Sequence, residues 1–276
     1  MTRGELIERI AAHFAAAPLS YGHGTDNARD EAAWLVLRGL GLPFDAELAD
    51  AVSAADVRKI DKLGTERVDA RTPVAYLLKE AWLAGVPFYV DERVVVPRSH
   101  IAELLPRLRK RFPDTRRILD LCTGSGCLGI LAARAFPAAD VDAADISPGA
   151  LAVARKNVAR HRLGRRVRLV RSDLFAALRG RRYDLIVTNP PYVSAAAMAA
   201  LPAEYRREPR LALAGGHDGL EIVARIVEQA GAHLAPGGAL VCEVGESHSA
   251  ARRRFRALKL RWPKPEVFLY LPSARR

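Results

Sequence analysis

The amino-acid sequence predicts an α/β protein whose main domain is a largely parallel, doubly wound sheet. Three observations lead to this fold class. From residue 117 onward, short β-type runs alternate with helical stretches, the order that joins parallel strands by crossover helices. Residues 1–80 show only helical periodicity, and two short β-type runs separate the two parts. Within 276 residues we therefore expect a small helical domain at 1–80, a β-hairpin linker at 81–99 and the α/β domain at 100–276.

The first 80 residues contain apolar positions at the spacing of one helix face. Residues 5–17 and 28–40 both carry such a face, and a third helix is expected to begin near Ala54 with Ser53 as its N-cap. Gly and Pro residues mark the joints between these segments. The pattern predicts a helical bundle.

The linker contains two β-type runs, Val86–Val90 and Arg93–Pro97. Asp91 and Glu92 separate them and are suitable turn residues, so the sequence predicts that the two runs pair as a hairpin. A helix is expected to follow at Ile101–Arg111.

Six strands and three further helices are expected in the α/β domain. The strands are Arg117–Leu121, Asp140–Asp145, Val167–Arg171, Tyr183–Thr188, Ala239–Val244 and Glu266–Leu271. The helices are Gly129–Phe136, Pro148–Leu163 and Gly219–Leu234. Sheets of this kind bind ligands beyond the carboxyl ends of their strands, where the strand order reverses. Residues that follow a strand are therefore the candidates for a functional site.

The net charge of +12 is distributed unevenly along the chain. Residues 1–97 contain 11 Lys or Arg and 15 Asp or Glu, whereas residues 98–276 contain 32 and 16. A basic domain attracts polyanions such as RNA. Arg outnumbers Lys 36 to 7, however, which also suits a compositional bias that leaves part of the Arg as solvated surface. Both interpretations stay open at this point.

Several classes of protein are disfavoured by composition. No apolar run approaches the roughly 18 residues of a membrane span, and the first residues lack the plan of a signal peptide. The three cysteines, Cys122, Cys127 and Cys242, have no metal-ligand spacing. We expect a cytoplasmic protein with reduced thiols, no bound metal and no membrane contact.

A glycine-rich turn, from Asp120 to Gly129, follows the first expected strand and opens a helix. Its candidate cofactor-binding residues are Asp120, Cys122, Thr123, Gly124, Ser125 and Gly126. Glycines let a backbone bend sharply and approach a ligand closely. Dinucleotide-binding enzymes share such a turn, but this one is not Gly-x-Gly-x-x-Gly and an acid ends the preceding strand. Asp120 is expected to attract the ammonium group of a cofactor, directly or through water.

Two more acids end the next two strands. Asp145 is suited to accept hydrogen bonds from both hydroxyls of a ribose. Asp173 is suited to accept one from the adenine amino group, with Leu174 and Ile146 beside the ring. Acids in this order on successive strands, after the glycine turn, indicate S-adenosylmethionine as the cofactor and S-adenosylhomocysteine as its product.

The run Asn189-Pro190-Pro191-Tyr192 ends the fourth strand. The prolines restrict the chain and leave carbonyl groups free to accept. The side-chain carbonyl of Asn189 and the backbone carbonyl of Pro190 can each accept one N–H of an amide or amino group, and Tyr192 offers a flat stacking face. Asn189, Pro190 and Tyr192 are therefore the candidate catalytic residues, and all four residues are candidate substrate contacts. Adenine, cytosine and glutamine all present such a planar nitrogen.

With further motifs, the chain resembles the glutamine-amide methyltransferase family, which acts on protein release factors and one ribosomal protein. These motifs are Arg71–Leu77, Phe88–Val90, Val96–Ser99 and His217–Leu220. The resemblance covers essentially the whole chain. Nucleic-acid adenine methyltransferases share Asn189–Tyr192 but do not normally carry the upstream motifs. The resemblance implies a Rossmann-like class I S-adenosylmethionine-dependent methyltransferase domain after a helical domain and a hairpin.

Two branches of that family differ at the hairpin and the cofactor turn. The release-factor branch typically has Pro-Arg-Pro-Glu-Thr-Glu and Gly-Thr-Gly-Ser-Gly there. This chain has Pro97-Arg98-Ser99-His100 and Cys122–Gly126, similar to the branch that methylates the third protein of the large ribosomal subunit. Val95 stands where the release-factor branch often has Phe. His100 departs from the Pro that is common in the ribosomal branch.

The resemblance also implies residue roles. Cofactor contacts are expected at Cys122–Gly126, Asp145 and Asn189, and substrate contacts at Asn189–Tyr192. Arg98 is a candidate substrate contact. Three alternatives stay open: Arg98 orders the hairpin, contacts the cofactor, or forms a structural salt bridge.

The leading hypothesis is methylation of a glutamine amide on the ribosomal protein, with the helical domain recognising that protein. A basic enzyme should repel a free basic ribosomal protein, so we expect a substrate already on RNA in an assembling particle, with ribosomal RNA against the basic domain. The alternatives are methylation of release factors, methylation of adenine in nucleic acid, and a non-catalytic RNA-binding assembly factor.

Overall fold

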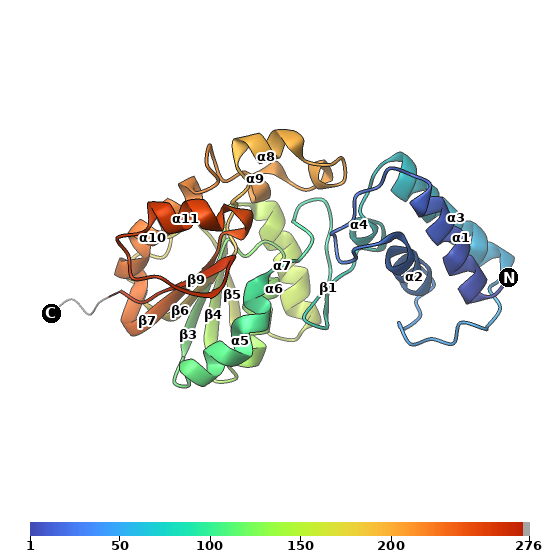
Figure 1. The fold of residues 1–276 in the computed structure, drawn as a ribbon. Helices are drawn as coiled ribbons and strands as arrows, with labels where there is room; N and C mark the ends of the chain where they lie inside the picture. Colours follow the sequence, from blue (N-terminus) through green and yellow to red (C-terminus); the bar gives the residue numbers. More distant parts are fainter. Residues whose placement is uncertain (273–276) are drawn as a thin grey trace.

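The computed structural model describes residues 1–272. Its first part is helical, with α1 (Arg3–Ala15), α2 (Ala28–Gly39), α3 (Ala54–Asp69) and α4 (Val74–Leu78). These helices lie together at one end of the molecule, away from the sheet (Figure 1). Ser53 caps α3 as predicted, since its side chain accepts a hydrogen bond from the Asp56 N–H.

The second part is built on a seven-stranded sheet. Its strands are β3 (Arg117–Leu121), β4 (Asp140–Asp145), β5 (Val167–Arg171), β6 (Tyr183–Thr188), β7 (Leu234–Glu243), β8 (Arg261–Lys264) and β9 (Val267–Tyr270). The order across the sheet is β5-β4-β3-β6-β7-β9-β8. The first five strands in this order run parallel, and β9 and β8 complete the sheet antiparallel. The predicted α/β class and its strands are confirmed, and β8 is an addition.

Helices cover both faces of this sheet. They are α5 (His100–Arg111), α6 (Cys127–Ala135), α7 (Pro148–Arg160), α10 (Glu221–His233) and α11 (His248–Arg254). Two short helices, α8 (Ala195–Ala200) and α9 (Arg210–Leu213), lie in the segment after β6, beyond the strand ends (Figure 1), and short 3-10 turns lie at Tyr205–Arg207 and Gly245–Ser247. Ile118 and Leu185 pack with α5 and α6 on one face, whereas their neighbours Leu119 and Ile186 pack with α10 on the other. This alternation follows from the two-residue period of a strand.

The strand order reverses beside β3. The chain passes from β3 outward to β4 and β5 and then returns to β6 on the other side of β3. Thr188 at the end of β6 pairs with Leu121 at the end of β3. The residues that follow, Asn189 and Cys122, therefore lie next to each other where doubly wound sheets bind ligands.

The predicted hairpin is wrong in its pairing. Val86–Phe88 (β2) pairs with Ala81–Leu83 (β1), not with the run Arg93–Pro97. Ala84 and Gly85 both have positive φ angles, +49° and +73°, as a tight two-residue hairpin turn requires. The run 93–97 forms no strand, since Arg93 lies in a turn and Val94 in a bend, and it connects the helical bundle to the sheet domain with Val94 and Val96 buried.

A buried arginine joins the two parts of the molecule. The Arg67 side chain is fully buried; its Nε donates to Glu31 (3.0 Å) and its Nη1 to Glu204 (3.1 Å). Its Nη2 donates to the backbone carbonyl of Ser20. Glu204 belongs to the segment after β6 and also accepts from Arg71. The helical bundle is thus held against the sheet domain by charged groups that have lost their water.

The sequence analysis did not foresee α4, α8, α9 or α11. The last four residues of the expected domain 100–276 lie outside the described residues. Among residues 1–272, none of the helices has the length and apolar character that crossing a bilayer requires.

Candidate functional site

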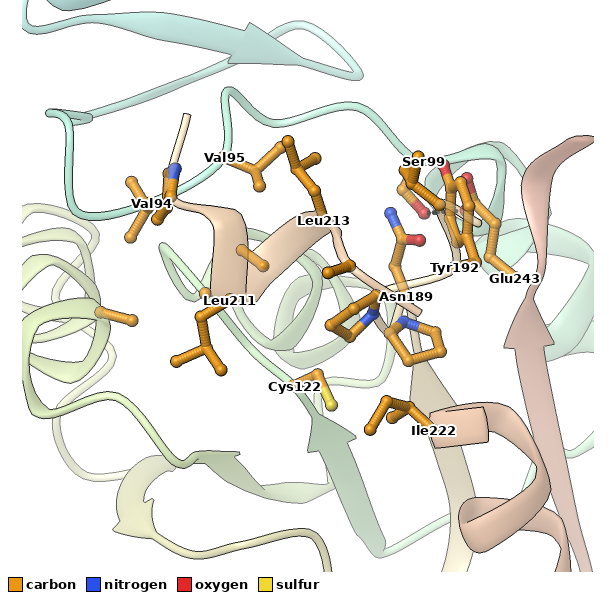
Figure 2. A pocket seen from close by; sticks show the side chains of 18 of the residues that line it. Val94, Val95, Ser99, Cys122, Asn189, Tyr192, Leu211, Leu213, Ile222 and Glu243 are labelled. Atoms are coloured by element: carbon orange, nitrogen blue, oxygen red, sulfur yellow. Dashed lines mark hydrogen bonds between the residues drawn. The ribbon is translucent and has the colours of Figure 1, made fainter. Parts of the chain in front are cut away.

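A cavity of about 990 Å³ lies over the carboxyl ends of the parallel strands. Its walls come from the turn after β3, the end of β4, the motif after β6, the crossing segment 93–100 and the segment 193–214. Figure 2 shows Asn189 between two groups of side chains, with Ser99, Tyr192 and Glu243 on one side and Leu211, Leu213 and Val95 on the other. The cavity therefore has a polar side and an apolar side.

The glycine-rich turn forms the floor of the cavity. Cys122, Thr123, Gly124 and Ser125 line it, and their contact with a cofactor stays a prediction. Gly126 does not line the cavity, but the turn requires a glycine there. Its φ angle is +82°, and a Cβ added to it would stand only 3.2 Å from the Cβ of Ala154. The turn thus offers backbone groups to a ligand with little side-chain bulk.

Asp120 lies somewhere other than expected. Its carboxyl group is fully buried beneath the turn, and Asp120 is not among the residues that line the cavity. Oδ2 accepts hydrogen bonds from the Gly129 N–H (2.8 Å) and from the Thr123 hydroxyl. Burial raises the pKa of Asp120 to about 7. This side chain holds the shape of the turn, and the expected direct contact with a cofactor ammonium group is not supported by its position.

Asp145 lines the cavity at the end of β4. Its Oδ2 accepts from the Gly124 N–H (2.9 Å) and its Oδ1 from the Ser147 N–H (2.9 Å). Burial raises the pKa of Asp145, while these backbone donors lower it. Each oxygen keeps a free lone pair, so the fixed carboxylate can still accept from two neighbouring hydroxyls. Ile146 lies beside it and is 46% exposed.

Asp173 and Leu174 line the cavity after β5. Leu174 is buried, with a φ of +45° that turns the chain back toward the sheet. The Asp173 carboxylate is exposed and pairs with Arg225 of α10 at 3.1 Å. This ion pair, which the sequence did not predict, lies at the cavity rim.

Asn189 has a fixed orientation. Its Nδ2 donates to the backbone carbonyl of Arg98 at 3.0 Å. Its Oδ1 is buried and has no hydrogen-bond partner among the described residues. Buried acceptors are nearly always paired in proteins, so an unpaired one that borders a cavity indicates a donor supplied by a ligand. Pro190 and Pro191 follow it and also line the cavity.

Tyr192 is enclosed by glycines. A Cβ added to Gly245 would stand 2.4 Å from the Tyr192 ring, and one added to Gly219 would stand 2.3 Å from the Tyr192 carbonyl oxygen. Ser247 donates to the same carbonyl at 3.2 Å. Burial raises the pKa of the Tyr192 hydroxyl, so the ring stays neutral near pH 7.

Arg98 forms a salt bridge, which was one of the roles considered for it. Its guanidinium contacts both carboxylate oxygens of Glu208, with Nη1 to Oε1 at 2.7 Å, and lies over the Tyr205 ring. Arg98 also lines the cavity, so a substrate contact stays a prediction. Its backbone carbonyl, rather than its charge, is the group that contacts Asn189.

Glu243 lines the cavity at the end of β7 and was not predicted. Its Oε2 accepts from the Ser99 hydroxyl (2.6 Å) and from the His100 N–H (3.0 Å) at the start of α5. Burial raises its pKa. The sequence signal that could have identified Glu243 as a cavity residue is its position at the end of a buried β-type run.

No group of three or more His, Cys, Asp or Glu side chains with metal-site geometry occurs within residues 1–272. The three cysteines are free thiols, and burial raises the pKa of Cys127 to about 12.

Comparisons with known proteins agree with this geometry. A family model described as "Methyltransferase small domain" matches residues 101–204. The chain is 48% identical over 279 residues to the ribosomal protein uL3 glutamine methyltransferase of Bradyrhizobium diazoefficiens, covering 94% of this chain and 88% of that protein. It is also 48% identical over 269 residues to the protein of the same name from Bordetella pertussis, with 95% and 90% covered. The chain belongs to the ribosomal protein uL3 glutamine methyltransferase family.

Solved structures show the same fold. The hMettl16 catalytic domain in complex with the MAT2A 3′UTR hairpin 6 superposes with a TM-score of 0.53, covering 84% of this chain and 88% of that one at 14% identity. The predicted Rossmann-like methyltransferase fold is confirmed, as is the family to which the sequence motifs were similar.

Proposed function

We propose that this protein methylates the side-chain amide nitrogen of a glutamine in ribosomal protein uL3, with S-adenosylmethionine as methyl donor. The observation that carries the proposal is the buried, unpaired Oδ1 of Asn189 beside the cofactor turn. A primary amide supplies the N–H group that this oxygen lacks. The names of the relatives support glutamine as the amide and uL3 as the protein.

The cavity fits S-adenosylmethionine. Asp145 would accept from the ribose hydroxyls, and Asp173, Ile146 and Leu174 would surround the adenine, as their places on the cavity wall support. Cys122–Ser125 would contact the amino-acid end with backbone groups. The cofactor supplies a methyl group on a positively charged sulfur, and S-adenosylhomocysteine is left after transfer.

The motif residues would bind and orient the glutamine amide. Asn189 Oδ1 and the Pro190 carbonyl each accept one N–H, which fixes the plane of the amide and opposes the delocalisation that weakens its nitrogen as a nucleophile. Tyr192 stacks on the amide face. The nitrogen attacks the methyl carbon, the N–C bond forms as the S–C bond breaks, and a nitrogen proton then passes to water. No strong base is needed, because the alkylated nitrogen is acidic.

Methyl transfer to purified substrates tests the proposal. Purified uL3, a release factor and a large-subunit ribosomal RNA fragment are incubated separately with the enzyme and methyl-labelled S-adenosylmethionine. Label on one glutamine of uL3 is expected. Label on the release factor or on adenine alone would support one of the alternative functions instead. No label on any of the three, nor on uL3 in assembling particles, would refute the methyltransferase assignment.

We further propose that the sheet domain contacts ribosomal RNA through a basic edge. We define this edge by the exposed residues Arg107, Lys110, Arg111, Arg116, Arg117, Arg134, Arg162, Arg165, Arg179 and Arg182. They lie in the second half of α5 and near the end of α6, at the start of β3, and in the turns before β3, β5 and β6, so they share the edge opposite the cavity. None of them forms an ion pair within residues 1–272.

An RNA contact on this edge would leave the cavity free to reach uL3 on an assembling particle in the cytoplasm, with the helical bundle recognising the protein. RNA binding is measured as a function of salt for Arg116→Gln/Arg165→Gln and for a control pair on the helical bundle, Arg58→Gln/Lys62→Gln. Loss of two phosphate contacts should reduce the slope of log K against log salt by about 1.8. Equal slopes for the two variants would refute the basic edge as an RNA surface. Separately, faster methylation of free uL3 than of uL3 in assembling particles would refute the assembling particle as the substrate.

A further inference from the structure

Two buried carboxylates hold the crossing segment on either side of the carbonyl that binds Asn189. Glu208 accepts from the Val96 N–H at 2.9 Å, and Glu243 accepts from the His100 N–H at 3.0 Å. The backbone carbonyl of Arg98 lies between these two points and accepts from Asn189 Nδ2. The partner of the Asn189 amide is therefore fixed from both directions.

Glu208 differs from Glu243 because it does not line the cavity. Its side chain is fully buried, and its two oxygens contact the Arg98 guanidinium in a bidentate pair. One oxygen also accepts from the Val96 N–H. Charge-assisted bidentate pairs are among the strongest and most directional hydrogen bonds in proteins. Glu208 thus fixes both the side chain of Arg98 and the backbone just before it.

The orientation of an asparagine amide depends on such a partner. The last torsion of Asn is broad and roughly two-fold, and its oxygen and nitrogen have nearly the same shape. The Arg98 carbonyl can only accept, so it selects the state with Nδ2 toward itself and Oδ1 toward the cavity. In the opposite state the amide would present N–H groups to the N–H groups of a substrate amide, and neither could accept.

We propose that Glu208 is a positioning residue for methyl transfer, because its hold on Arg98 keeps the Asn189 carbonyl aimed at the substrate nitrogen. The inference rests on the proposed function. It predicts that loss of the Glu208–Arg98 pair lowers the rate of transfer from the bound state, while the cofactor residues after β3 and β4 keep their geometry.

Glu208→Gln and Glu204→Gln make a matched pair for the test. Both carboxylates lie in one short segment, both are buried, and neither lines the cavity. Glu204 contacts Arg67 and Arg71 of the helical bundle instead of Arg98. A Gln at 208 keeps the size but turns two donors toward the guanidinium. Glu208→Gln should lower kcat about 10- to 100-fold with the KM for S-adenosylmethionine unchanged, since small misplacements cost rates of that order.

Glu204→Gln should leave kcat within about threefold of wild type, although the thermal stability of the two variants should fall similarly. An equal loss of kcat in both variants would overturn the proposal, as would no loss in Glu208→Gln. Should Glu208→Gln fail to fold, Arg98→Lys replaces it, because a single ammonium keeps Glu208 paired but cannot form the bidentate contact. The same fall in kcat is expected.

A spectroscopic readout separates this inference from the substrate assignment. In ¹⁵N-labelled enzyme, the side-chain NH₂ signals of Asn189 are identified by their loss in Asn189→Ala. They should shift or broaden in Glu208→Gln and stay in place in Glu204→Gln, with no substrate needed. Unchanged signals in Glu208→Gln would refute the positioning role even if uL3 is methylated. Absent methylation with shifted signals would refute only the proposed substrate.

Discussion

Replacement of Asn189 by Ala should remove catalysis while leaving the cofactor site intact. The substitution deletes Oδ1, one of the two acceptors expected to bind the amide N–H groups. Loss of one group that stabilises a transition state in a buried site costs about 2.7–4 kcal/mol, or about 10²–10³ in kcat. It also deletes the 3.0 Å hydrogen bond to Arg98, worth about 1 kcal/mol of stability, so Tm should fall by about 2–4 °C.

The assay measures methyl transfer to purified uL3 at saturating concentrations of both substrates, with S-adenosylmethionine binding measured by calorimetry. The control is Asn27→Ala, which removes an exposed cap of α2 and costs about 1 kcal/mol of stability without touching the cavity. Asn189→Ala should lower cofactor affinity much less than it lowers kcat, because Asn189 is only one of the expected cofactor contacts and Cys122–Ser125 and Asp145 are unchanged. If Asn189→Ala keeps kcat within threefold of the control, the role given to its carbonyl is wrong.

Three further perturbations test other parts of the structure. Gly245→Ala should lower kcat/KM at least about tenfold and leave the circular dichroism spectrum unchanged. The φ angle of Gly245 is +49°, and an added Cβ would stand 2.4 Å from the Tyr192 ring, so the ring would have to move. Wild-type activity in this variant would contradict the placement of that ring. Arg67→Ala should cost about 3–5 kcal/mol in urea unfolding, because it leaves the buried Glu31 carboxylate unpaired and leaves Glu204 with Arg71 alone. Arg58→Ala on the same helix should cost little, and equal effects would refute the buried network. Burial lowers the pKa of His23 from 6.5 to about 4, so the unfolded chain binds this proton first and stability falls as pH drops from about 6.5 to 4. Between pH 7 and 5 the protonation of this histidine should lower the free energy of unfolding by about 2 kcal/mol, so His23→Gln should lose about 2 kcal/mol less than the wild type over that range. If the wild type and His23→Gln lose the same free energy of unfolding between these pH values, His23 is not the group responsible.

Local patterns predicted the strands of the sheet well. Each expected strand from Arg117–Leu121 to Tyr183–Thr188 appears with the same bounds. The central strands β3 and β6 are mainly apolar, as buried parallel strands usually are. Cys122 and Asn189 were expected to follow the first and fourth strands of the domain, and the structure shows that these strands are neighbours. The expectation of a site there needed only the rule that ligands bind where the strand order reverses.

Features that depend on contacts distant in sequence were not predictable in the same way. The run Arg93–Pro97 has β-type composition, but Val94 and Val96 pack into the core of the helical bundle and Val95 lines the cavity. The real hairpin turn is at Ala84–Gly85. An acid that ends a strand has the same sequence pattern whether it lines a cavity or, like Asp120, anchors a turn beneath it. Glu208 and Glu243 are separated from their partners by more than 100 residues, so no local pattern could connect them.

The central claim is that this protein methylates a glutamine amide of uL3. The most direct measurement is mass spectrometry of uL3 from cells with the intact gene, without it, and with the gene for Asn189→Ala. One glutamine of uL3 should carry an added methyl group only in cells with the wild-type enzyme, and release factors should be the same in all three. Methylated uL3 in cells that lack the protein, or a loss confined to release factors or RNA, would contradict the account.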